Sequence, residues 1–133
     1  MAEERRRGGS VRLGRARSGP LHHHDLCFGC GQANLFGLQL ELVRVAGGVE
    51  GRFFVKEDHQ GPEGFAHAGV LTAALEEAIA LAAGTRPTRL SVELVAPAPV
   101  GAFVRVRADA ASATASNDEG GVLARAEARK VDI

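Results

Sequence analysis

Apolar side chains recur along the chain with two different periods, and each period predicts one kind of element. From Gly37 onward, L-Q-L-E-L-V-R-V alternates apolar and polar residues, and V-E-G-R-F-F-V follows after an A-G-G turn. This alternation around a glycine turn predicts an antiparallel hairpin of two strands. Residues 56–65 hold glycines, a proline and several charged or imidazole side chains, which favours a loop.

Residues 65–84 predict a helix that is apolar on nearly every side. The larger apolar side chains between 70 and 82 follow a period of 3.6, and alanine fills most of the other positions. Such a helix belongs inside a structure and not along its edge. Two adjacent carboxylates, Glu76 and Glu77, nevertheless stand in its middle, although an unpaired buried carboxylate costs several kcal/mol.

Three more strands are predicted at 89–95, 103–111 and 121–131, each with one covered and one wetter face. The A-P-A-P run at 96–99 must separate the first two, because proline cannot donate to a central ladder. The order is therefore strand, strand, helix and then the remaining strands. One buried helix with about five to six strands predicts an α+β architecture, in which an antiparallel sheet wraps around a central helix.

Composition limits the organisation and the partners of the chain. Its 133 residues suit one domain, which we place at 21–133, and the arginine-rich and glycine-rich residues 1–20 predict a disordered basic arm. Zero net charge and the lack of Tyr and Trp argue against a nucleic-acid partner. No apolar stretch reaches the ~20 residues of a membrane span. Without a secretory signal and with only two cysteines, we expect a cytoplasmic protein.

Three motifs carry a resemblance to a known family. They are C-F-G-C-G-Q-A-N-L-F-G-L at 27–38, H-Q-G-P-E-G-F-A-H-A-G-V-L-T-A-A-L-E-E-A at 59–78, and L-S-V-E-L-V-A-P-A-P-V-G at 90–101. Together they resemble the PaaI-like hotdog-fold acyl-CoA thioesterases. The resemblance implies a hotdog fold, hydrolysis of an acyl-CoA or acyl-carrier-protein thioester, and a homodimer or dimer of dimers with interfacial active sites. It implies no cofactor and no metal.

The same resemblance implies roles for single residues. Glu76, nine residues after His67, matches the family's catalytic acid, acting as base or nucleophile. The backbone N–H of Ala68, at a position usually held by glycine, matches the oxyanion donor at the helix N-terminus. The acid lies about 12 Å of helical rise from that donor, so it would act on a thioester held by the other subunit.

Burial is the property that we expect to distinguish the two acids. A desolvated carboxylate is a stronger base, and we expect Glu76 to be the desolvated one. Glu77, rotated by about 100°, should pair with a basic residue or reach solvent. The alternative places both acids on the surface of an ordinary amphipathic helix. We group His67 with the catalytic residues, chiefly in a structural or substrate-orienting role.

Five further positions are candidates for substrate binding: His59, Gln60, Gly69, Thr88 and Ser91. Two departures from the family pattern favour an alternative function. Ala68 carries an extra methyl group beside the oxyanion position, and Ala80, one turn after Glu76, lacks the hydroxyl that some relatives place there. The alternative is a non-hydrolytic hotdog protein that binds or modifies an acyl or enoyl thioester in a biosynthetic pathway.

The segment H-H-H-D-L-C-F-G-C at 22–30 contains the residue types that ligate zinc. No second ligand pair at knuckle spacing follows it, and the strand-to-helix context of thioredoxin-like motifs is missing. We therefore interpret Cys27 and Cys30 as part of a packed turn and expect no metal. A metal site and a redox pair stay open as alternatives.

Overall fold

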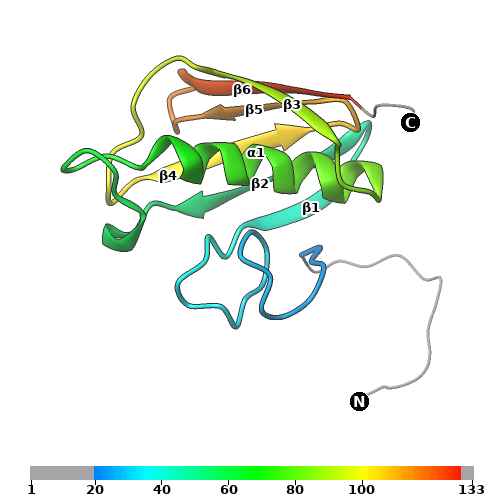
Figure 1. Ribbon diagram of the computed structural model, residues 1–133, viewed down its shortest axis with the longest axis horizontal. Coiled ribbons are helices and arrows are strands. Elements are labelled where there is room, and N and C mark those ends of the chain that lie inside the picture. Colours follow the sequence, from blue (N-terminus) through cyan, green and yellow to red (C-terminus); the bar gives the residue numbers. More distant parts are fainter. Residues whose placement is uncertain (1–19, 130–133) are drawn as a thin grey trace.

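The computed structural model describes residues 20–129, in which one antiparallel sheet has a long helix across one face and residues 20–40 form an irregular segment before the first strand (Figure 1). The sheet order is β1-β2-β4-β5-β6-β3. The predicted α+β architecture is confirmed. The elements are β1 Glu41–Val45, β2 Gly48–Phe54, η1 Glu57–His59, α1 Ala68–Ala83, β3 Arg89–Leu94, β4 Phe103–Ala108, β5 Ser112–Ser116 and β6 Val122–Arg129.

The helix α1 begins and ends at residues that suit its caps. His67 is the N-cap, and its ring accepts the N–H of Gly69 at 2.8 Å. Gly84 ends the helix in the left-handed conformation, which glycine adopts at no steric cost. One face of α1 is buried in the core, through Val70, Leu71, Ala74, Leu75, Ala78 and Ile79. The face with Thr72, Ala73 and Glu76 is only half-buried within this chain.

The strand predicted from Leu38 onward begins later, at Glu41. Gln39 takes a positive φ of 50°, which interrupts the extended backbone. The amides of Leu38 and Leu40 donate to carbonyls of the turn at 27–30 and not to β2. Both leucines are still buried, so alternation located the core side chains correctly but overestimated the length of the strand.

The strand predicted at 103–111 ends at Ala108, and β5 follows as a strand that the sequence did not predict. The carboxylate of Asp109 accepts the backbone N–H groups two and three residues ahead, each at 2.8 Å, and so turns the chain. These N–H donors hold the pKa of Asp109 below its usual value. The β5 sequence S-A-T-A-S has small side chains with little contrast in polarity, so its alternation gave no signal.

Several other predicted boundaries shift slightly. The strands expected at 89–95 and 121–131 are observed as β3 and β6, and residues 130–131 lie outside the described part. The predicted loop at 56–65 contains the short helix η1. The basic arm predicted at 1–20 lies outside the described residues except for Pro20. Within residues 20–129, no helix has the length and apolar character needed to cross a membrane.

Candidate functional site

The N-terminal end of α1 borders an open groove of about 430 Å³. The loop before the helix forms one wall, and the segment at the end of β3 forms the other. A volume of this size falls within the roughly 300–1,000 Å³ of ligand pockets. The lining is mostly apolar and consists of Pro62, Ala66, His67, Ala68, Leu71, Leu94, Val95, Ala96 and Pro97.

The backbone N–H of Ala68 is the free donor of this helix end. The N–H of Gly69 donates to Nδ1 of His67, and the N–H of Val70 donates to the His67 carbonyl at 2.9 Å. Within residues 20–129, the N–H of Ala68 has no hydrogen-bond partner. Because a helix N-terminus carries positive partial charge, this N–H suits an oxygen that gains negative charge.

Polar side chains brace the loop that leads into α1. His59 is buried; its Nδ1 accepts the N–H of Lys56 at 3.1 Å, and its Nε2 lies 3.2 Å from the Gly37 carbonyl. Burial lowers the pKa of His59, which favours the neutral ring. The Gln60 amide oxygen accepts the N–H of Gly64 at 2.7 Å, and its nitrogen donates to a carbonyl of η1. The substrate contacts expected of His59 and Gln60 stay predictions.

Ser91 lies in β3 and Thr88 just before it, and both are away from the groove. The hydroxyl of Thr88 donates to the Arg129 carbonyl at 3.2 Å, and Ser91 stands opposite Glu127 of β6. Neither residue lines the groove, which is formed by the far end of β3. The structure thus brings His67, Ala68 and the adjacent Gly69 together but does not bring the two hydroxyl residues to them.

The adjacent carboxylates of α1 occupy different environments. The Glu76 side chain is 28% exposed, whereas that of Glu77 is 4% exposed. Arg86 Nη1 contacts both oxygens of Glu76, at 2.9 and 3.0 Å, and Oε1 of Glu77 at 3.2 Å. Pairing of Glu77 with a basic residue is confirmed. Within this chain Glu77 is the more buried acid, because the phase of the helix turns it inward. Desolvation of Glu76 at a subunit interface stays a prediction.

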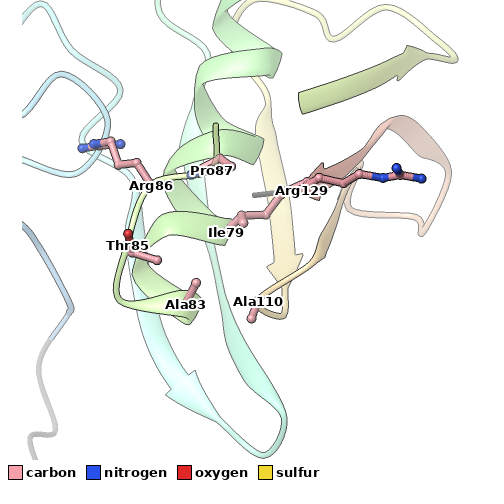
Figure 2. A pocket seen from close by; sticks show the side chains of 8 residues that line it. Ile79, Ala83, Thr85, Arg86, Pro87, Ala110 and Arg129 are labelled. Carbon is pink, nitrogen blue, oxygen red and sulfur yellow. The ribbon is translucent and has the colours of Figure 1, made fainter. Parts of the chain in front are cut away.

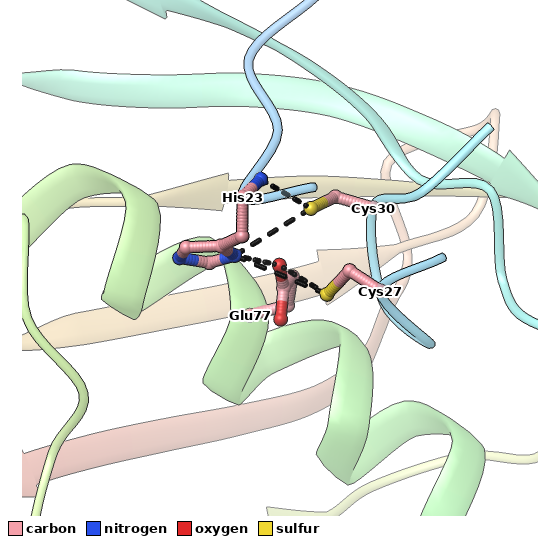
Figure 3. A group of neighbouring side chains, drawn as sticks. All are labelled: His23, Cys27, Cys30 and Glu77. Carbon is pink, nitrogen blue, oxygen red and sulfur yellow. Dashed lines mark hydrogen bonds and ion pairs between the residues drawn. The ribbon is translucent and has the colours of Figure 1, made fainter. Parts of the chain in front are cut away.

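Glu77 is the inner member of a cluster with His23, Cys27 and Cys30 (Figure 3). Its Oε2 lies 2.6 Å from His23 Nδ1 and 3.3 Å from Cys27 Sγ. Burial by itself would raise the pKa of Glu77, but the two thiols and His23 hold it below its usual value. The H-x3-C-x2-C spacing was the available sequence signal, and nothing local linked it to the helix.

A smaller cavity of about 120 Å³ lies at the C-terminal end of α1 (Figure 2). Arg86 and Arg129 are part of its lining, but their side chains point away from each other, and Arg86 extends toward the N-terminal segment. This cavity is smaller than typical ligand pockets. The groove beside Ala68 is therefore the better candidate for a substrate.

Solved structures share this architecture. The chain is 22% identical to the thioesterase superfamily protein RHA08564, with a TM-score of 0.66 over 81% of this chain and 63% of that one. The PaaI protein of the E. coli phenylacetic acid degradation operon is 16% identical, with a TM-score of 0.60 over 74% and 84%. The smu.793 protein of Streptococcus mutans, bound to acetyl CoA, is 16% identical, with a TM-score of 0.55 over 68% and 91%.

These likenesses establish the fold. The helix on a six-stranded antiparallel sheet is the hotdog fold of the thioesterase superfamily structures, which confirms the fold predicted from the three motifs. The chain spans 63% of the length of RHA08564. No protein-family model matches the sequence, and no curated protein matches it.

Proposed function

We propose that the protein hydrolyses acyl thioesters of coenzyme A or of an acyl-carrier protein. The observation that carries the proposal is the Ala68 N–H, a donor without a partner within residues 20–129, at the edge of a mostly apolar groove. The fold adds support, since its solved relatives include thioesterase superfamily proteins and a protein bound to acetyl CoA.

In this proposal the thioester carbonyl oxygen accepts the Ala68 N–H, and the acyl chain lies along the apolar wall of the groove. Negative charge that develops on the oxygen in the transition state is stabilised by the N–H and by the helix dipole. His67 contributes by capping the helix and so fixing the direction of the donor. A single such donor typically contributes about 10²–10³ in rate.

Glu76 supplies the second half of the chemistry. As a base, it removes a proton from water while the water oxygen bonds to the carbonyl carbon; the C–S bond then breaks and the thiolate leaves. As a nucleophile, its carboxylate oxygen bonds to the carbonyl carbon, the C–S bond breaks and the thiolate leaves, and water then hydrolyses the mixed anhydride. Arg86 holds both carboxylate oxygens and so limits the rotation of the side chain.

Glu76 and Ala68 of one helix are too far apart to act on the same carbonyl, at about 12 Å of helical rise. The proposal therefore includes a homodimer or a dimer of dimers in which Glu76 faces the groove of a second copy. Two features support it. β3 is an edge strand of the sheet, and Leu94 at its end is 54% exposed while lining the groove. The half-buried helix face with Glu76 is a second surface suited to a partner.

The remaining predicted contacts belong to the same proposal as candidate substrate-binding residues. Gly69 adjoins the Ala68 donor. The side chains of His59 and Gln60 brace the loop that leads into the helix start. Ser91 lies on the edge strand β3 and Thr88 just before it, where only a second copy would bring them toward a substrate.

Purified full-length protein assayed against acyl-CoAs of graded chain length tests this function. Glu76→Gln is expected to lower kcat by about 10²–10⁴, the usual contribution of a general base. Glu119→Gln, in the exposed turn before β6, is the matched control and should leave kcat unchanged. Equal turnover by wild type and the Glu76 variant would contradict the proposal. Measurable binding with no hydrolysis across the panel would instead favour the non-hydrolytic alternative.

A further inference from the structure

Four side chains of metal-ligand type converge beside α1, and the proposed thioester chemistry uses none of them (Figure 3). Nδ1 of His23, the two sulfurs of Cys27 and Cys30, and a carboxylate oxygen of Glu77 all lie within 4.8 Å of one another. Three of the four residues are buried. We propose that these residues bind one zinc ion, which ties the N-terminal segment to the helix.

The distances between the ligand atoms match tetrahedral zinc. Zinc bonds of about 2.0–2.3 Å to nitrogen, oxygen and sulfur give tetrahedron edges of about 3.3–3.8 Å. The observed separations are 3.3 Å from Cys27 Sγ to Glu77 Oε2, and 3.5 and 3.9 Å from His23 Nδ1 to the sulfurs of Cys30 and Cys27. The pair of His23 Nδ1 and Glu77 Oε2, at 2.6 Å, is closer than such an edge. The His23 side chain is 30% exposed, so its ring has room to rotate and widen that edge.

The backbone around the two cysteines lets their turn lie close to the Glu77 carboxylate. At Gly29 a Cβ would lie 2.5 Å from Cγ of Glu77, so only glycine lets the turn press against the carboxylate. The N–H of Gly31 donates to the Cys27 carbonyl at 2.9 Å and closes the turn between the two thiols. The N–H of His23 donates to Cys30 Sγ at 3.1 Å, which ties the N-terminal segment to this sulfur.

Charge and coordination number also fit a closed zinc site. Two thiolates and one carboxylate around Zn²⁺ give a net charge of minus one, which the guanidinium of Arg86 balances. Arg86 holds Oε1 of Glu77, so Oε2 is the oxygen that faces His23 and Cys27. Zinc takes the place of the two thiol protons, which pass to solvent. Because protein atoms fill all four positions, the site is structural and holds no water for catalysis.

The zinc ligands do not follow the knuckle pattern, in which a second ligand pair comes after the cysteines, and for that reason the sequence predicted no metal. The structure supplies the other two ligands differently: His23 precedes the pair on the same segment, and Glu77 comes from α1 far along the chain. Their proximity is a consequence of the fold and is not visible in the spacing.

Metal analysis of untagged full-length protein, purified under reducing conditions, tests the proposal without any measurement of hydrolysis. We expect one zinc per chain, and we expect Co²⁺ in its place to show thiolate charge-transfer bands and the intense visible bands of tetrahedral cobalt. In competition with a chromophoric chelator, His23→Gln should weaken zinc binding on the order of a hundredfold, about one ligand's share of a structural site's affinity. Cys27→Ser should do the same.

His22→Gln is the matched control, because His22 is the sequence neighbour of His23 but pairs with Asp25 outside the cluster. It should bind zinc as the wild type does. Equal zinc affinity in the His22 and His23 variants would overturn the proposal. Wild-type protein that takes up no zinc on titration after reduction would also overturn it. The same holds for protein that is isolated with a Cys27–Cys30 disulfide and is then reduced.

Discussion

Two regions of the helix α1 differ in how their polar groups are satisfied. At its N-terminus, the Ala68 N–H has no partner within residues 20–129 and borders an open apolar groove. About two and a half turns further on, Glu77 is almost fully buried, and both of its oxygens have partners. An exposed donor without a partner suits a transient ligand, whereas a buried and fully paired carboxylate suits a permanent structural contact.

Arg86 connects the proposed catalytic acid with the proposed zinc site. One of its nitrogens contacts Glu76, the proposed catalytic acid, and Glu77, the proposed zinc ligand. Partial burial would lower the pKa of Arg86, but the two carboxylates raise it overall, so the guanidinium stays charged. Two neighbouring residues of the helix thus give one partly exposed acid and one buried acid, and both pair with the Arg86 guanidinium.

Removal of zinc is expected to produce the largest change in stability. A ligand present at 100 to 1,000 times its dissociation constant stabilises the folded state by about 3–4 kcal/mol. Thermal unfolding of reduced wild type with zinc and then with excess chelator should show this loss. The double variant Cys27→Ser/Cys30→Ser should not respond to the chelator. An equal loss of stability with chelator in the wild type and in the double variant would contradict the claim that Glu77 belongs to a structural zinc site.

Gly29→Ala probes the same cluster through packing. The new methyl group would overlap Cγ and Cδ of Glu77, which lie 2.5 and 2.6 Å from the position that a Cβ would take at this glycine. We expect a loss of about 1–3 kcal/mol, as for other overpacked sites. Urea unfolding measures it, with a parallel zinc titration. An unchanged midpoint would mean that the turn does not press on the carboxylate.

His59, in the loop before the helix, should make the free energy of unfolding depend on pH, which is a smaller effect. Burial lowers the pKa of His59, so the unfolded chain takes up a proton that the folded one resists. The free energy of unfolding should therefore fall as the pH drops below about 6.5, with a slope of at most ~1.4 kcal/mol per pH unit. His59→Asn should flatten this slope in urea titrations, and His24→Gln, an exposed control, should keep it. A slope that survives in the His59 variant would exclude this cause.

Much of the fold was predictable because its strongest signals are local. The helix and the first hairpin have long runs with a clear period, and their turns contain the glycines that such turns need. β5 was missed because alanine, serine and threonine give almost no contrast between its two faces. The early end of β4 depends on Asp109, whose side-chain bonds to the backbone leave no trace in hydrophobic periodicity.

The candidate site was predictable only in part, for a related reason. The position of His67 and Ala68 at the helix start follows from a short motif, and the structure places them side by side at the groove. The environment of Glu77 depends on a segment about fifty residues earlier in the chain, which no local pattern reports. Which of two adjacent acids faces inward depends on a rotation of about 100°, so a small error in helix phase exchanges them.

The central claim is that the Ala68 N–H stabilises the oxyanion, and substitution of that single donor tests it most directly. Proline is well tolerated at the first position of a helix, and His67 already has the extended ψ of 143° that a residue before proline prefers. Ala68→Pro therefore removes the N–H while keeping the helix, and Ala68→Gly keeps the N–H. We predict that kcat/KM for acyl-CoA falls by about 10²–10³ in the proline variant and is retained in the glycine variant. Wild-type kcat/KM in a folded proline variant would contradict the account.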